Sequence, residues 1–562
     1  MKTKTSLSRL LLAPLCLGLM VSFTVNGQEF KHAAVVSAHP EASKAGISII
    51  KRGGNAIDAT IAVQFALAVV YPDAGNIGGG GFLVYRDKNG NTDALDYREK
   101  APEKASRDMY LDAQGNAITD KSLYGALASG VPGTVDGMVK AHNKYGKLSW
   151  KKDIQPAIDL AENGFQLTEQ QAALLNTYRE KFLKYNNKPT VFVKKDLWKA
   201  GDILKQPQLA KTLKLIRDNG RKGFYEGAVG AAIVAAMKNT SGLITAKDLK
   251  DYSSVWRKTV SGKYKNYTVI SMPPPSSGGI ALLTMLKQVG EYPLSKWGFQ
   301  RDSTVQLMVE LERRAYADRA SYLGDPDFFK VPQAALLDGG YIMSRTEGIS
   351  LDKATPSSEV KPGTLPLKES EQTTHCSIVD SEGNAVSATT TLNGYFGSTV
   401  VVDGAGFILN NEMDDFSVKP GTPNMYGLVG GEANSIVAGK RMLSSMTPTI
   451  IEEDGKLRMV VGTPGGSTII TSVFQTVLNV LAFGQSMQQA VASPRFHHQW
   501  LPDEVFVEKG AIDNATRVKL EYKGYKITER EPMGRVDAIL VKPNGSLETG
   551  ADPRGDDKGL GY

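Results

Sequence analysis

The sequence of 562 residues contains only two cysteines, Cys16 and Cys376. Cys16 lies in an N-terminal segment that we expect to be removed, so the mature chain would keep Cys376 alone. A chain with one cysteine forms no internal disulfide, and its stability must come from a large hydrophobic core. The cysteine content therefore excludes a fold held together by disulfides.

The chain also has no strong excess of positive or negative charge. The formal net charge is +7, and three of these charges, on Lys2, Lys4 and Arg9, belong to the same N-terminal segment, which leaves +4 for the mature chain. So weak a balance gives no reason to expect nucleic acid or a membrane surface as a partner.

The first 27 residues have the pattern of a secretory signal. The basic start is followed by an apolar core from Leu10 to Phe23 and by the small-residue segment Val25-Asn26-Gly27. The apolar core is short for a membrane span. We therefore expect a signal peptide over residues 1–27, no membrane span, and a secreted protein, most simply in the periplasm of a bacterium.

The mature chain divides into two parts. Residues 28–372 are expected to be mostly helical, and they end in an exposed, mobile linker over 349–372, which is rich in Ser, Pro, Lys, Thr and Glu. Residues 373–562 begin with two strand-like runs and continue with strands and apolar helices. Strands flanked by apolar helices indicate a layered α/β domain.

The position of Thr373 at the boundary between the two parts suggests that it is a catalytic nucleophile. A threonine hydroxyl is a poor nucleophile at neutral pH unless a base lies beside it, and the first residue of a chain carries its own base, the α-amino group. We therefore predict that the precursor cuts itself between Gln372 and Thr373 and then uses Thr373 as its nucleophile.

The turn after Thr373 predicts a neighbour for it. If Gly383 takes the left-handed position of a three-residue hairpin loop, Asp380 pairs with Asn384 and Thr373 lies opposite Thr391. Asn393 then follows two residues further on the same face. A hydroxyl opposite the nucleophile can orient it, and a nearby amide can bind substrate.

Other polar motifs are ambiguous when each is taken alone. Gly465 and Gly466 precede an apolar helix and could hold an oxyanion, or they could belong to a plain strand-to-helix turn capped by Ser467. The segment 410–416 is dense in carboxylates and amides and could bind an ammonium group or form a solvated loop. Arg98 could bind a carboxylate or lie on the surface. Ser444-Ser445 alone does not distinguish a binding site from an ordinary loop.

Taken together and in order, these motifs resemble the γ-glutamyltranspeptidase (glutathione hydrolase) family within the N-terminal nucleophile hydrolases. The matching segments, spread over nearly the whole mature chain, are Gly53 to Ala56, Gly78 to Phe82, Arg98, Pro273 to Gly279, Thr373 to His375, Asn410 to Ser417, Ser444-Ser445, Gly465-Gly466 and Pro494 to His498. The resemblance implies an α/β (α+β) fold, the four-layer αββα sandwich, formed jointly by a large and a small subunit that are cut from one precursor and stay together as a heterodimer.

The resemblance also implies catalytic roles. Thr373 would attack first the Gln372 carbonyl and then a γ-glutamyl amide, Thr391 would hydrogen-bond its hydroxyl, and Gly465 and Gly466 would form the oxyanion hole. The γ-glutamyl ester would react with water, or with an amino acid or dipeptide acceptor in transpeptidation, after release from glutathione or a related γ-glutamyl compound. Tyr426 would gate the site from a lid loop, and no cofactor is implied.

Substrate binding is implied at two charged ends. Arg98, Ser444 and Ser445 would hold the α-carboxylate. Asn393, Glu412 and Asp415 would hold the α-ammonium. A γ-glutamyl group is a zwitterion, so each of its charges would pair with an opposite protein charge.

Some residues depart from the family pattern or invite another interpretation. Position 412 is Glu where some bacterial members carry Gln. Cys376 replaces a common aromatic residue, and its parity puts it on the hairpin face opposite to Thr373, so we expect a core residue. His375 shares the Thr373 face, although the mechanism needs no histidine base. No second ligand cluster accompanies His497 and His498, so we predict no metal.

Rival classes remain open. A serine hydrolase would need a histidine as its base, and this chain has six histidines that could serve. The chain lacks the Gly-x-Ser-x-Gly motif of the nucleophile elbow. A nucleotide-binding module would use Gly78 to Gly81 as its phosphate-binding loop, but this loop lacks the Gly-Lys-Ser/Thr sequence that ends such loops. A β-lactam side-chain (glutaryl or cephalosporin) acylase of the same superfamily would use the same nucleophile, and a chain that is never cut would be a non-enzymatic periplasmic binding protein.

Overall fold

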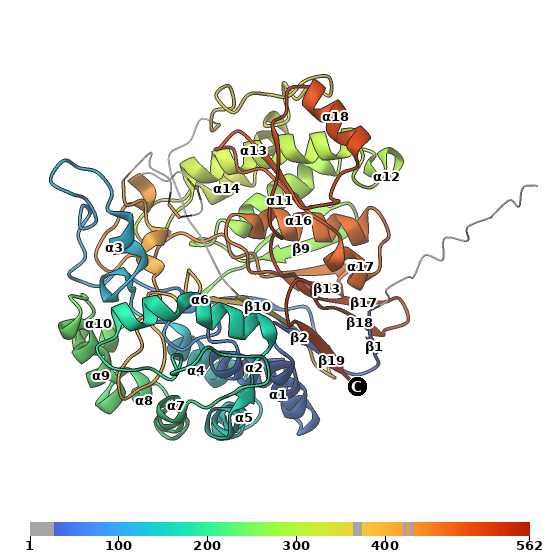
Figure 1. Cartoon of the computed structure of the whole chain (residues 1–562). Helices are drawn as coiled ribbons and strands as arrows, with labels where there is room; N and C mark the ends of the chain where they lie inside the picture. Colours follow the sequence, from blue (N-terminus) through green and yellow to red (C-terminus); the bar gives the residue numbers. More distant parts are fainter. Residues whose placement is uncertain (1–26, 364–373, 420–423, 426, 429–431) are drawn as a thin grey trace, which may run out of the picture.

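The computed structural model describes residues 27–363, 374–419, 424–425, 427–428 and 432–562 (Figure 1). The expected cleavage residues Gln372 and Thr373, the lid residue Tyr426, and all but the last residue of the expected signal peptide lie outside the described residues.

Two antiparallel sheets of seven strands each form the centre of the fold. The order of the first sheet is β19 (Lys558–Gly561), β2 (Ala34–Ser37), β10 (Thr374–Val379), β11 (Ala385–Thr391), β3 (Gly80–Arg86), β4 (Thr92–Asp96) and β7 (Val255–Arg257). The order of the second sheet is β1 (Glu29–Phe30), β18 (Leu547–Gly550), β17 (Asp537–Val541), β13 (Lys456–Gly462), β12 (Thr449–Glu453), β9 (Tyr267–Ser271) and β8 (Val260–Tyr264).

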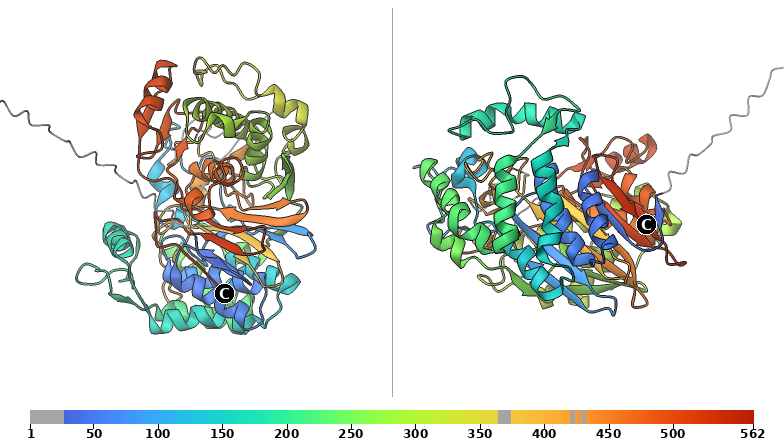
Figure 2. Two further views of the ribbon diagram at one scale, coloured as in Figure 1. Left: turned by 90° about the vertical axis from the view of Figure 1, so that its right-hand side faces the viewer. Right: turned by 90° about the horizontal axis from the view of Figure 1, so that it is seen from below.

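Helices cover the outer face of each sheet, and the two sheets face each other (Figures 1 and 2). Against the first sheet lie α1 (Pro40–Lys51), α2 (Ala56–Val70) and α4 (Thr134–Tyr145), with α5 (Trp150–Asn163) packed on α2. Against the second lie α11 (Gly278–Val289), α16 (Thr468–Leu481) and α17 (Met487–Ala492), with α13 (Asp302–Tyr322) packed on α11. The expected four-layer αββα sandwich is confirmed.

The remaining elements extend this frame. The helices are α3 (Thr119–Leu123), η1 (Ala126–Ala128), α6 (Glu169–Tyr185), α7 (Pro207–Asn219), α8 (Lys222–Tyr225), α9 (Gly227–Asn239), α10 (Ala246–Asp251), α12 (Leu294–Trp297), α14 (Gln333–Leu336), α15 (Gly339–Ser344), η2 (Glu412–Asp415), η3 (Glu432–Asn434) and α18 (Asn514–Tyr522). The strands are β5 (Phe165–Gln166), β6 (Ile203–Leu204), β14 (Phe496–His497), β15 (Val505–Val507) and β16 (Ile527–Glu529). No helix in the described part of the chain is long and apolar enough to cross a membrane.

The pattern of the β10–β11 hairpin explains how it lies between two layers. Side chains alternate along a strand, so Cys376 and Ile378 pack with α2 in one core cluster. Val379 and Ala385 point the other way and join the core between the two sheets. The expectation that Cys376 is a buried core residue is confirmed, and burial raises the pKa of its thiol to about 12.

The predicted hairpin register is confirmed over the described residues. Thr374 pairs with Thr390 and Val379 with Ala385, and the Asp380 amide donates to the Asn384 carbonyl at 3.0 Å. Gly383 has φ +89°, the left-handed conformation that the argument required.

Several strands in the large-subunit part were not predicted from the sequence, among them β7, β8 and β9. β7, β8 and β9 lie within a region expected to be mostly helical. β7 forms one edge of the first sheet, and β8, next to β9, forms one edge of the second. Each is five residues or shorter, and β8 carries the polar sequence Val-Ser-Gly-Lys-Tyr. β7 pairs with β4 and β9 pairs with β12, both distant in the sequence, whereas β8 pairs with β9 in a local hairpin. Sheet pairing, rather than the pattern of each short segment alone, stabilises these strands.

The described part of the expected linker, residues 349–363, is held against the C-terminal part of the chain. The Ser357 amide donates to Asp503 Oδ2 at 2.7 Å, and the Trp500 indole donates to the Val360 carbonyl at 2.9 Å. Both Ser357 and Val360 are buried.

Two buried carboxyl groups, Asp58 and Asp153, meet between α2 and α5. Asp58 is the N-terminal cap partner of α2 and accepts the amides of Asn55 and Lys147, each at 2.9 Å. Asp153 has no hydrogen-bond donor among the described residues, and its Oδ2 lies 3.6 Å from His142 Nε2. Burial, followed by the Asp58 carboxylate, raises the pKa of Asp153 to about 8.

We expect Asp153→Asn to weaken the pH dependence of stability. The unfolded chain loses this proton near the ordinary pKa of 3.8 and the folded chain near 8, so stability falls as pH rises between these values, by about 1.4 kcal/mol per pH unit. The urea midpoint measured from pH 5 to 8 should fall more steeply for the parent than for the variant. Asp159→Asn, an exposed change on the same helix, is the control, and equal slopes for the parent and Asp153→Asn would contradict the assignment.

Candidate active site

The end of the β10–β11 hairpin carries the first predicted site residues. Thr391 is fully buried, and its hydroxyl accepts the Asn393 amide at 2.7 Å. The same hydroxyl lies 3.4 Å from Glu412 Oε2. Thr373, its predicted partner, lies outside the described residues, and the last described pair is Thr374 with Thr390.

Asn393 turns the chain away from β11. Its φ of +71° is left-handed, a conformation that Asn adopts more readily than most residues. The side-chain amide donates to the Asn411 carbonyl at 3.0 Å. Its Oδ1 atom is buried and has no hydrogen-bond partner among the described residues, which leaves one acceptor suited to an ammonium group.

Segment 410–415 is held by the glycine-rich run that precedes β3. The Asn410 amide donates to the carbonyls of Gly78 and Gly130, at 2.8 Å each. A Cβ at Gly78 would lie 2.2 Å from the Ile408 carbonyl oxygen. The glycine therefore serves close backbone packing, which fixes where Glu412 and Asp415 lie.

Arg98, Glu412 and Asp415 form one fully buried cluster. Arg98 Nη1 pairs with Glu412 and Nη2 with Asp415. Arg98 also donates to the Met442 and Leu443 carbonyls at 3.3 and 3.1 Å. The resemblance implied that these cationic and anionic groups bind opposite ends of a ligand, and in this structure they pair with each other.

Glu99 is a fourth charged group that the sequence analysis missed. It is fully buried, its Oε2 lies 3.6 Å from Arg98 Nη1, and neither carboxyl oxygen has a hydrogen-bond donor among the described residues. Burial, followed by the charge of Glu412, raises the pKa of Glu99 well above its ordinary value. An acid beside an arginine is usually a surface pair, so the sequence held no signal for this role.

Burial also governs the other two carboxyl groups. It raises the pKa of Glu412 to about 7 although Arg98 acts in the opposite direction. The pKa of Asp415 is raised as well, again by burial first and against Arg98. Three acids therefore share one arginine away from water, and such a cluster favours any additional cation.

Ser444 and Ser445 are buried where a loop from the first part of the chain meets the second. The Ser444 amide donates to the Pro275 carbonyl at 2.9 Å, and the Ser277 amide donates to the Ser444 carbonyl at 2.6 Å. Arg319 of α13 donates to the Ser445 hydroxyl. Arg319 is a second buried arginine at this position, and its place inside a long helix pattern gave no sign of it.

Gly465 and Gly466 form a turn between β13 and α16 that only glycine fits. Gly465 has φ +137° and Gly466 has φ +63°. A Cβ at Gly465 would lie 2.7 Å from Thr468 Oγ1 and 2.9 Å from Gly534 Cα. Among the described residues neither amide donates a hydrogen bond to a protein acceptor. Two amides at a helix start suit an oxyanion.

One of the two interpretations of this turn was a plain strand-to-helix turn capped by Ser467. Ser467 occupies the N-cap position of α16 but makes no side-chain capping hydrogen bond. Instead, the Thr468 hydroxyl donates to the Gly465 carbonyl at 2.6 Å. This bond closes the turn on its carbonyl side.

The histidines near these elements have structural partners. His375 Nδ1 and Nε2 lie 2.9 and 3.1 Å from the hydroxyls of Thr389 and Ser377. Burial lowers the pKa of His375 to about 3, so the ring is neutral. His497 lies 2.9 Å from both Thr471 Oγ1 and Gln499 Oε1.

Comparison with known proteins gives a consistent result. The family model described as gamma-glutamyltranspeptidase matches residues 42–562. The glutathione hydrolase proenzyme of Escherichia coli (strain K12) is 49% identical over 535 residues, which is 95% of this chain and 92% of the relative.

Two solved structures extend the comparison. The cephalosporin acylase of Bacillus halodurans superposes with a TM-score of 0.85 at 26% identity, over 96% of this chain and 97% of its own. A chain of the Helicobacter pylori gamma-glutamyltranspeptidase superposes with a TM-score of 0.58 at 47% identity, over 58% of this chain and 95% of its own.

Proposed function

Since the chain belongs to the γ-glutamyltranspeptidase family, we infer that it is a glutathione hydrolase and γ-glutamyltransferase. It is an N-terminal nucleophile hydrolase by fold. We propose further that it is secreted to the periplasm and that Thr373 is its nucleophile. The observation that carries the proposal is the buried cluster of Arg98, Glu412 and Asp415 beside the Thr391 hydroxyl.

The first step is self-cleavage. The Thr373 hydroxyl attacks the Gln372 carbonyl, the peptide C–N bond breaks, and the departing nitrogen becomes the α-amino group of Thr373. Water then hydrolyses the ester on Thr373. The products are a large subunit over 28–372 and a small subunit over 373–562, and the new α-amino group is the base for later turnover.

Substrate binding follows from an exchange of ion pairs. The γ-glutamyl group brings one carboxylate and one ammonium, so its entry adds no net charge. Arg98 transfers from the acids to the substrate carboxylate, together with Ser444 and Ser445. Glu412 and Asp415 then accept the ammonium, and Asn393 Oδ1 offers a further acceptor. Arg98 keeps a carboxylate partner before and after binding, and the substrate ammonium brings a cation to the acids that Arg98 leaves.

Acyl transfer uses the glycine turn. Attack by Thr373 on the γ-carbonyl develops an oxyanion, which the amides of Gly465 and Gly466 stabilise. The α-amino group takes the threonine proton and gives it to the leaving amine. A water molecule or an amino acid or dipeptide amine then attacks the ester and releases Thr373.

A chromogenic assay tests this activity. γ-Glutamyl anilide should be hydrolysed, and glycylglycine should increase the release of the aniline by acting as an acceptor. Glutaryl anilide lacks only the α-ammonium and is the matched substrate for the alternative function, a β-lactam side-chain (glutaryl or cephalosporin) acylase. Hydrolysis of glutaryl anilide in preference to γ-glutamyl anilide would favour the acylase alternative.

Gly465→Ala should lower kcat by about 10²-fold, the scale of losing one oxyanion-hole donor. The added Cβ collides with Thr468 and Gly534 and so moves the amide. Gly484→Ala is the matched control, because Gly484 also has a left-handed φ, +68°, but a Cβ there meets nothing within 4 Å. A Gly465→Ala enzyme with the kcat of the control would exclude this turn from the oxyanion site.

A further inference from the structure

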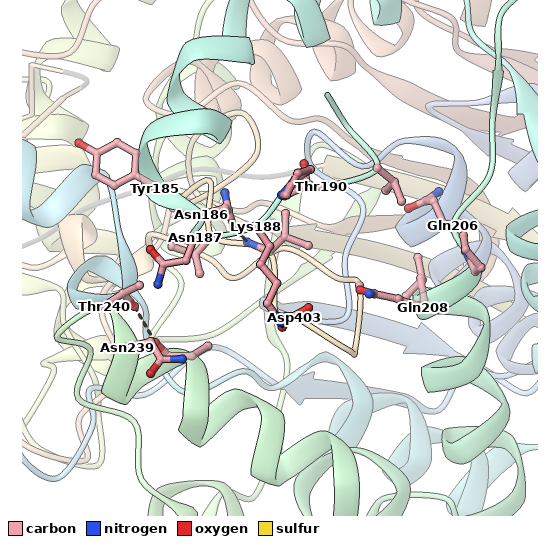
Figure 3. A pocket seen from close by; sticks show the side chains of 18 residues that line it. Tyr185, Asn186, Asn187, Lys188, Thr190, Gln206, Gln208, Asn239, Thr240 and Asp403 are labelled. Atoms are coloured by element: carbon pink, nitrogen blue, oxygen red, sulfur yellow. Dashed lines mark hydrogen bonds and ion pairs between the residues drawn. The ribbon is translucent and has the colours of Figure 1, made fainter. Parts of the chain in front are cut away.

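A cavity of about 240 Å³ lies away from the proposed active site, on the helical side of the first sheet. Its walls come from the end of α6 and the loop after it, the start of α7, the end of α9, and segment 400–406 (Figure 3). None of its lining residues is a site residue assigned above. The cavity therefore needs an explanation of its own.

Three carboxamide side chains surround its opening. Asn187 follows α6, Gln208 lies at the start of α7, and Asn239 ends α9 (Figure 3). The structure gives none of these three side chains a hydrogen-bond partner within the described residues. Each carboxamide offers two donors and one acceptor group, so together they suit a ligand that both donates and accepts.

Two further polar atoms lie deeper in the cavity wall. Thr190 Oγ1 and Gln206 Oε1 are buried, and neither has a hydrogen-bond partner among the described residues. Gln206 is 1% exposed, and its amide nitrogen is fixed by the Val69 carbonyl at 2.7 Å. A buried polar atom without a partner costs about 1–3 kcal/mol. Both atoms are closed off from the cavity, so the polar contacts open to a ligand come from the three carboxamides.

The charges at the rim cancel, and the rest of the wall is apolar. Lys188 Nζ and Asp403 Oδ2 pair at 2.5 Å, and both side chains are exposed. Val191 and Val401, both partly exposed, supply apolar surface. The cavity thus offers several neutral donors and acceptors, apolar contact and no unpaired charge.

We propose that this cavity binds an uncharged carbohydrate of one or two sugar rings. Sugar hydroxyls donate and accept at every ring position, which matches the three carboxamides, and the C–H face of a ring matches the valine surface. A planar base fits less well, because the one lining tyrosine, Tyr185, already stacks on Tyr124 at a centroid distance of 5.8 Å.

Saturation-transfer NMR of the purified protein with glucose, N-acetylglucosamine and maltose tests the proposal. We expect at least one sugar to bind at millimolar concentration. The double variant Gln208→Leu/Asn239→Leu should weaken binding about tenfold, since it removes two hydrogen-bonding groups. Gln170→Leu, an exposed change on α6 away from the cavity, should bind as the parent does.

Two further ligands in the same NMR experiment distinguish a carbohydrate site from a peptide site or a nucleobase site. Glycylglycine and adenosine represent peptide and base ligands, and variant-sensitive binding of either in place of the sugars would overturn the carbohydrate assignment. So would sugar binding that the double variant leaves unchanged, or no sugar binding by the parent. Hydrolysis of γ-glutamyl anilide should be equal in all variants, which shows that they fold and keeps this test independent of the active site.

Discussion

Thr373→Ala is expected to yield one uncut chain with no measurable γ-glutamyl anilide hydrolysis. The substitution removes the hydroxyl that attacks Gln372 in self-cleavage and the substrate carbonyl in turnover, so both steps fail together. Intact mass measurement and a steady-state assay on the same preparation report the two losses separately.

Two companion variants make this result specific. Thr373→Ser keeps a hydroxyl and should be cut, with reduced activity. Thr374→Val changes the neighbouring buried threonine without changing its shape and should be cut and active. An alanine variant at 373 that is processed and active would contradict the assigned nucleophile.

Asp415→Asn is expected to lower kcat/KM for γ-glutamyl anilide by about 10²- to 10³-fold, the scale of breaking a buried charge pair. The variant weakens the acceptor for the substrate ammonium and leaves Arg98 with one acid fewer in a fully buried cluster. Steady-state kinetics on processed protein provides the measurement, after mass analysis has shown that cleavage occurred.

Comparing γ-glutamyl anilide with glutaryl anilide shows whether this loss comes from ammonium binding or from damage to the local fold. Glutaryl anilide has no ammonium, so its weaker hydrolysis should change much less than that of γ-glutamyl anilide. Glu432→Gln is the control, because Glu432 is an exposed acid that pairs with Arg107. Equal losses on both anilides would mean that Asp415 only supports the local fold.

Local rules predicted the hairpin well. The period-two pattern of Thr374–Val379 and the glycine at 383 determine both register and face, because a slip by one residue would turn Cys376 and Ile378 away from α2 and into the core between the two sheets. The glycine turn at 465–466 was predictable for the same reason, since its conformation depends on residue type within a few positions.

The arrangement of the buried charged residues depends on long-range contacts and could not be predicted from the sequence. The pairing of Arg98 with both Glu412 and Asp415 joins residues more than 300 positions apart. Glu99 and Arg319 carry ordinary local patterns and become unusual only because the fold buries them. The family resemblance gave the roles of the charged residues, but not the arrangement in which they neutralise one another.

The most direct test is intact mass spectrometry of the purified parent protein, with a second sample quenched in acid during turnover of γ-glutamyl anilide. We expect two chains, the smaller beginning at Thr373, and in the quenched sample a small subunit heavier by one γ-glutamyl group on its N-terminal peptide. A single uncut chain that hydrolyses the anilide, or a γ-glutamyl group on any other residue, would contradict this expectation.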